Sequence, residues 1–102
     1  MTDVSATVKQ RGSRYGSMAT NAALTQALMA EVLTAARESG AVLTPMHREC
    51  LHMIMIKVTR MVCGDPLYAD NPHDIAGYAT RLEEYINELN GRETNDGNHL
   101  GM

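Results

Sequence analysis

One stretch of the chain, Leu51–Ala79, constrains the fold more than any other. It reads LHMIMIKVTRMVCGDPLYADNPHDIAGYA. Apolar residues recur at helical spacing up to Cys63, and Gly64-Asp65-Pro66 then interrupts the pattern. Asn71-Pro72 follows, a capping residue and a proline of the kind that begins a helix. The stretch therefore predicts the end of a buried helix, a tight connector and the start of another helix.

Two further helices are bounded by the same kind of signals. Ser17–Ser39 is rich in good helix formers, and Gly40 is the expected stop. Thr44 is a suitable N-cap for a helix that begins at Pro45 and ends before Gly64. No strand pattern is present. We therefore expect an all-α fold, a small helical bundle of three main helices plus an N-terminal arm.

The predicted domain organisation has three parts. Residues 1–16 form the N-terminal arm, residues 17–91 form the helical bundle domain, and residues 92–102 form a polar tail that we expect to be disordered. The third helix is expected to weaken near Asn90-Gly91, and Asp74 is placed at its third position. Three helices with eight methionines would leave apolar surface to cover, so a homo-oligomer is expected.

Composition excludes several classes of function. The chain has 9 basic and 12 acidic residues and a net charge of −3, which argues against broad nucleic-acid binding or attraction to an anionic membrane. No apolar run approaches the ~20 residues of a membrane helix. Cys50 and Cys63 would lie roughly 20 Å apart on one helix, too far for a disulfide. Two reduced cysteines favour a cytoplasmic location.

Charged side chains gather at the break in the opening stretch. Two helices joined by a short connector lie antiparallel, so Asp70 and Asp74 should lie close to Arg60, whereas Glu49 is about three turns away. One interpretation is a structural network of ion pairs and caps. The other is a pocket for a phosphorylated ligand. In that pocket cations bind phosphate and a tyrosine stacks on a base, with the candidate residues Arg11, Tyr15, Lys57, Arg60, Asp70, Asp74 and Tyr78.

One form of this ligand pocket would also contain a divalent metal ion, held by Asp70 and Asp74. His52 is interpreted as a hydrogen-bonded interior histidine. Neither cysteine has a histidine and a carboxylate at a spacing that indicates a nucleophile.

Three motifs, which cover about residues 8–90, carry a resemblance. They are Arg11-Gly-x-x-Tyr15-Gly, Leu51-His-Met-Ile-x-x-Lys57-x-x-Arg60, and Gly64-Asp-Pro-x-Tyr68-x-Asp70-x-x-x-Asp74-Ile-Ala-Gly-Tyr78-Ala. The chain resembles a family of small phage and prophage proteins of unknown function. It is similar to phage nucleotide-modification-associated domains and, more distantly, to MazG-type nucleoside triphosphate pyrophosphohydrolases. Those enzymes hold magnesium with Glu-x-x-Glu and Glu-x-x-Asp. In this chain Glu49-x-x-His52 stands at the place of the first motif. The second motif is absent, and only Asp70 and Asp74 are available near its expected place.

The resemblance implies a phage accessory protein in the cytoplasm of a bacterial host. Its expected function is to bind a nucleotide-like phosphorylated ligand, either to sequester it or to hydrolyse it with Mg²⁺, in a conflict between phage and host. The alternative is a non-enzymatic inhibitor that binds a host defence protein, as anti-CRISPR proteins do. In that case the acids of the last helix would face a basic partner. They are Glu83, Glu84 and Glu88.

Overall fold

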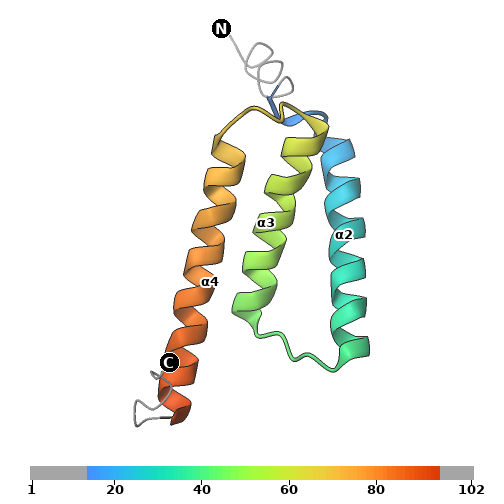
Figure 1. Cartoon of the computed structure of the whole chain (residues 1–102). Coiled ribbons are helices and arrows are strands. Elements are labelled where there is room, and N and C mark those ends of the chain that lie inside the picture. The colour runs from blue at the N-terminus through green and yellow to red at the C-terminus, as the bar shows by residue number, and fades with distance from the viewer. Residues whose placement is uncertain (1–13, 95–102) are drawn as a thin grey trace, which may run out of the picture.

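The protein is an all-α bundle of three helices, as the sequence predicts (Figure 1). The structure, a computed structural model, describes residues 14–94. It contains α2 (Met18–Ser39), α3 (Pro45–Cys63) and α4 (Asp70–Thr94), and residues 14–94 include no strand. Most of the predicted N-terminal arm, with Arg11, and residues 95–102 of the tail lie outside the described residues.

The ends of α2 and α3 are set by the residues that the sequence indicates. The Ser17 hydroxyl accepts a hydrogen bond from the Thr20 amide, and Gly40 ends α2 with a left-handed φ of 78°. Thr44 caps α3 in a reciprocal arrangement with His47, and Pro45 occupies the first turn. These local hydrogen bonds satisfy helix ends without help from distant residues, which is why sequence patterns locate them well.

The bounds of α4 differ from the prediction at both ends. The helix begins at Asp70, so Asp74 is its fifth residue and not its third. Pro72 falls within the first turn, where a missing N–H breaks no intrahelical hydrogen bond. At the other end α4 continues through Gly91 to Thr94, three residues beyond the predicted boundary of the bundle. A single glycine costs a helix only about 1 kcal/mol relative to alanine, so it does not stop α4.

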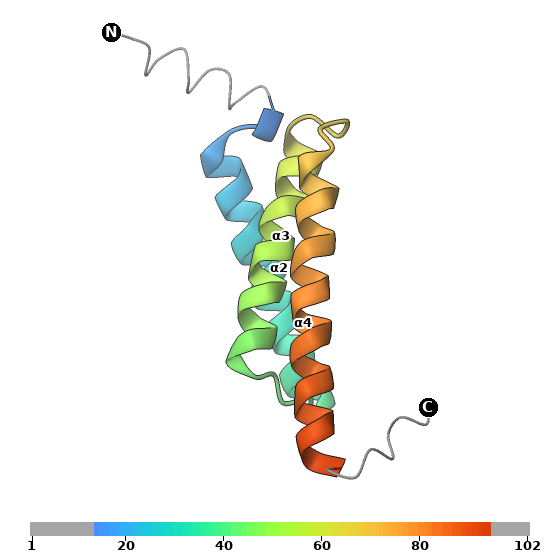
Figure 2. The same ribbon diagram turned by 90° about the vertical axis from the view of Figure 1, so that its left-hand side faces the viewer.

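The three helices lie side by side with α3 in the middle (Figure 1). Helix α3 packs on α2 and on α4, whereas α2 and α4 do not contact each other. Figure 2 shows the same arrangement after a turn of 90°, with α3 overlapping α2 in this view. The described bundle is therefore one layer of helices, and α3 is its central helix.

A single layer encloses little core. Met29 and Cys50 are the buried apolar side chains among residues 14–91. Thr25, Thr59 and Asn71 are buried polar residues. Both cysteines are free thiols, as expected. None of the helices in the described part of the chain is long and apolar enough to cross a membrane.

Candidate functional site

Two glycines bring the start of the described chain onto the connector between α3 and α4. The amide of Asp65 donates a 2.8 Å hydrogen bond to the carbonyl of Arg14. A Cβ atom added to Gly16 would overlap the carbonyl oxygen of Cys63, and one added to Gly64 would overlap the carbonyl of Arg14. Gly16 also has a positive φ of 82°. Backbone therefore packs directly on backbone here, and a side chain at either position would separate the two segments.

This contact assembles a cluster of aromatic rings and guanidinium groups, which we call the tyrosine cluster (Arg14, Tyr15, Arg60 and Tyr68). The Arg60 guanidinium lies 4.6 Å from the centroid of the Tyr15 ring. The Arg14 guanidinium lies 4.3 Å from the centroid of Tyr68, and the two rings are 5.9 Å apart. Cations at this distance are attracted by the ring face. The cluster therefore fixes the Arg60 side chain relative to α2 and the connector.

Tyr68 extends the cluster to the start of α4. Its hydroxyl donates a 2.8 Å hydrogen bond to Oδ2 of Asp70. This bond holds the proton on the phenol, so the hydrogen bond to Asp70 raises the pKa of Tyr68 above its ordinary value. Tyr68 is thus a neutral donor over the whole physiological pH range.

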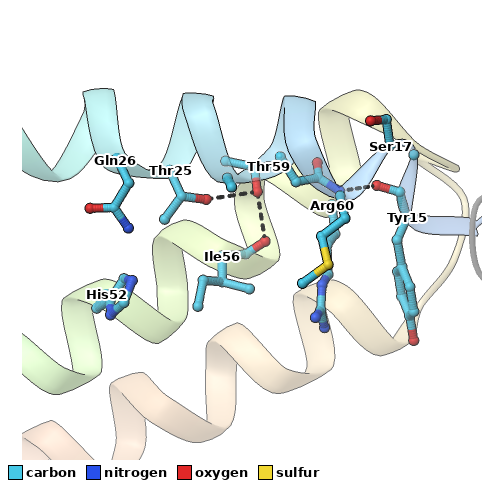
Figure 3. A pocket seen from close by; sticks show the side chains of 12 residues that line it. Tyr15, Ser17, Thr25, Gln26, His52, Ile56, Thr59 and Arg60 are labelled. Atoms are coloured by element: carbon cyan, nitrogen blue, oxygen red, sulfur yellow. Dashed lines mark hydrogen bonds between the residues drawn. The ribbon is translucent and has the colours of Figure 1, made fainter.

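A cavity of about 500 Å³ opens between α2 and α3 beside this cluster (Figure 3). That volume lies within the 300–1,000 Å³ range of small-molecule sites. Arg60 and Tyr15 lie at one end of the cavity, and His52 and Gln26 lie at the other (Figure 3). The space between these two ends is lined by residues of both helices and of the segment before α2, among them Ser17, Met18, Asn21, Ala22, Thr25, Ile56 and Thr59.

Arg60 is the cation of the cavity. Its side chain is half-buried, and no carboxylate among residues 14–91 lies within ion-pair distance of it. A cation with reduced solvent contact gains from a nearby anion, because the low local dielectric strengthens their attraction. The end of the cavity next to Tyr15 is consequently suited to a negatively charged group.

Asn21 joins the wall of the cavity to the segment before α2. Its amide nitrogen donates to the backbone carbonyl of Tyr15, which fixes the orientation of the side chain. Its Oδ1 atom is buried and has no hydrogen-bond partner among the described residues. A buried acceptor without a partner is costly. Solvent does not reach this atom, so the observed role of the Asn21 amide is its hydrogen bond to the segment that carries Tyr15.

His52 differs from its prediction as a hydrogen-bonded interior residue. It lines the cavity, is half-buried and makes no hydrogen bond to another described residue. The helical phase explains the difference, since residues 52, 56 and 60 share one side of α3 and this side faces the cavity.

The structure brings together only part of the predicted site. Tyr15 and Arg60 line the cavity. Lys57 instead pairs with Asp74 at 3.1 Å, with 13% of its side chain exposed. The predicted contact between Arg60 and Asp70 or Asp74 is absent, because Lys57 lies on the side of α3 that faces α4 and Arg60 turns onto Tyr15.

The remaining predicted residues lie apart from the cavity. Asp70 is bonded to Tyr68, and the Tyr78 ring is 5.5 Å from the Arg81 guanidinium. Asp70 and Asp74 are thus each engaged by a neighbour. No group of three or more histidine, cysteine, aspartate or glutamate side chains that could hold a metal ion occurs within residues 14–91.

Sequence reasoning missed Asn21 and Gln26. Both are ordinary polar residues of an amphipathic helix, and only the pairing of α2 with α3 directs them into a cavity. A useful signal was the position of Asn21 one turn after the N-cap Ser17, close to the segment that carries Tyr15. No protein-family model matches the chain, and no curated protein or solved structure matches it either.

Proposed function

We propose that the protein binds a nucleotide-like phosphorylated ligand in the cavity between α2 and α3. The observation that carries the proposal is Arg60, a half-buried cation that lines the cavity, is fixed on Tyr15 and lacks a carboxylate partner among the described residues. A guanidinium presents several N–H donors in a plane and suits a phosphate better than other side chains do.

The other end of the cavity suits a heterocyclic base. His52 and Gln26 can donate or accept hydrogen bonds, while Ile56 adds an apolar wall. His52 and Arg60 are eight positions apart on α3, a rise of about 12 Å. That length is comparable with a nucleotide extended from base to phosphate.

We favour sequestration over hydrolysis. Asp70 and Asp74 are the carboxylates that would hold Mg²⁺ in a hydrolase, but each is already engaged, by Tyr68 and by Lys57. Neither lines the cavity. A phage accessory protein of this kind would withhold a nucleotide signal from the host and leave it chemically unchanged. Turnover that requires Mg²⁺ and disappears in Asp74→Ala would contradict this part of the proposal.

Thermal stabilisation by a panel of linear and cyclic nucleotides, with and without Mg²⁺, tests binding. A ligand at 100 times its dissociation constant adds about 2.7 kcal/mol to the free energy of unfolding. Arg60→Met should remove most of that stabilisation. Arg81→Met is the matched control, because Arg81 also lies over a tyrosine ring but is exposed and outside the cavity. Stabilisation by no member of the panel, or equal stabilisation of both variants, would refute the proposal.

The alternative, inhibition of a host defence protein, is supported by a different observation. Glu83, Glu84 and Glu88 are exposed on α4, away from the cavity. They present carboxylates to a basic partner. Co-purification of a host protein that is lost when the three glutamates are changed to glutamine, but not in Arg60→Met, would favour this function over ligand binding.

We further propose that the protein is a homo-oligomer. The support is the small core, since two buried apolar side chains among residues 14–91 are few for a stable domain.

A further inference from the structure

We propose that a second copy of the chain covers the side of the helix layer opposite the cavity. The two copies would be related by a twofold axis and would pair α3 against α3. This inference deepens the proposal of a homo-oligomer by naming its surface and symmetry, and it is independent of the ligand.

The two sides of α3 follow from its contacts. Thr59 is hydrogen bonded to Thr25 and so faces α2. Lys57 pairs with Asp74 and so faces α4. Residues 52, 56 and 60 face the cavity on one side of the layer. At 100° per residue, the side of α3 away from the cavity is apolar. It includes a stripe, about 100–160° round the helix from Ile56, which consists of Leu51, Met55, Val58 and Val62.

The described helices cover this apolar stripe only in part, because α2 and α4 flank α3 and do not meet each other. Leu51, Met55 and Val58 remain half-buried, and Val62 is 64% exposed. The same helical geometry places Leu28 of α2 and Ile86 of α4 beside the stripe, and both are half-buried. A helix layer with an apolar side is stable when a second layer packs on that side.

The spacing of the stripe identifies the occupant. Successive members are four, three and four residues apart, which is the spacing of a helix–helix seam. This order is the same in both directions along the helix. An antiparallel copy of α3 can therefore match it, with Leu51 opposite Val62 and Met55 opposite Val58. A surface that is complementary to itself in this way is what a twofold dimer requires.

Charge and area are also compatible with a second copy. The stripe side of α3 carries no charged residue from Leu51 to Val62, so two chains of net charge −3 would not bring like charges together in the seam. With α3 about 28 Å long and three helices about 9 Å apart, the side measures roughly 800 Å². A stable dimer buries about that area on each partner.

Light scattering after size-exclusion chromatography tests the assembly. The purified chain should have twice its 11.2 kDa mass. Val58→Glu should raise the dimer dissociation constant about 100-fold or more, because it buries a charge in the seam. Met53→Glu is the matched control, a half-buried methionine of α3 outside the stripe, and should leave the dimer intact. A wild-type chain of 11.2 kDa at every concentration, or equal effects of both variants, would overturn the proposal.

Cross-linking tests the pairing even if Val58→Glu fails to fold. In a background with Cys50→Ala and Cys63→Ala, a chain carrying both Leu51→Cys and Val62→Cys should give a covalent dimer with a short thiol cross-linker. Val62→Cys alone should not, since the two copies of that residue would lie roughly 16 Å apart along the seam. Efficient cross-linking of the single variant, or none of the double variant, would contradict the antiparallel arrangement.

Discussion

The guanidinium of Arg60 lies 4.6 Å from the centre of the Tyr15 ring, which joins the middle of the helix layer to the segment before α2. The guanidinium is held by an aromatic face and not by an acid, so its positive charge is not neutralised by an ion pair with a described residue. An arginine that is both fixed in place and uncompensated is suited to an anionic ligand.

Substitutions of Tyr15 should separate its ring from its hydroxyl. Tyr15→Phe keeps the ring face, so the unfolding free energy and nucleotide binding should change little. Tyr15→Leu removes the cation–π contact with Arg60 and should cost about 0.5–1 kcal/mol. It should also weaken the proposed ligand binding, because Arg60 would then have to be ordered by the ligand. Denaturant unfolding and calorimetric titration measure the two effects, and equal behaviour of both variants would show that the ring is unimportant.

The buried threonine pair predicts an asymmetric result. Thr59 is fully buried and donates to the carbonyl of Ile56, so its oxygen can accept from the hydroxyl of Thr25. Thr59→Val would leave the Thr25 hydroxyl without its acceptor, at a cost of about 1–3 kcal/mol. Thr25→Val should cost less, because Thr59 keeps its bond to Ile56.

The double variant completes this threonine cycle. Once Thr25 is valine, no hydroxyl is left to be orphaned, so adding Thr59→Val should cost less than it does alone. Urea unfolding of the four proteins gives the coupling energy. Additive losses would mean that the two hydroxyls do not interact.

Alanine substitutions of three glycines should change the stability of the protein in different directions. Gly16→Ala and Gly64→Ala force a Cβ atom into facing backbone, and each should destabilise the protein by about 1–3 kcal/mol. Gly77→Ala is the control, since Gly77 lies within α4 with open space around it. That change should stabilise by up to about 1 kcal/mol. Thermal unfolding of the three variants decides whether the close backbone contact exists.

Alkaline pH should weaken the tyrosine cluster. The hydrogen bond to Asp70 raises the pKa of Tyr68, so the folded protein keeps a proton that the unfolded chain loses near its ordinary pKa of about 10. The contribution of this group to stability is therefore complete below about pH 10 and falls as pH rises through its folded pKa. Phenolate absorbance should show one late-titrating tyrosine in the folded protein. Tyr68→Phe should remove that component, and its persistence would assign it elsewhere.

Local signals explain how much of the fold could be predicted. Ser17, Gly40 and Thr44 set helix ends through bonds to their near neighbours, so the pattern alone located them. The start of α4 was misplaced because Asn71-Pro72 has the features of a cap and first residue, yet Asn71 is already helical and buried against the bundle. Distant packing overrode a local preference there.

The candidate site needed the tertiary structure. Helical phase predicted that Arg60 would lie near the connector, but it did not show that a tyrosine would hold it. The fit of Gly16 against Cys63 and of Gly64 against Arg14 depends on segments far apart in the chain. The cavity itself depends on how α2 lies along α3. The position of Asn21 one turn after Ser17 indicates that it lies near Tyr15, but it does not indicate a cavity.

The central position of α3 has a consequence for how the chain opens. Because, among the three described helices, α2 and α4 each pack on α3 and not on each other, either outer helix can detach without breaking a helix–helix contact of the other. Amide hydrogen exchange should therefore be slowest in α3 and should report two separate opening events, one for each flank. A molecule bound between α2 and α3 would slow exchange on one flank and leave the α4 flank as it was. Occupancy of the cavity would then appear as a local change in the protection of backbone amides from exchange.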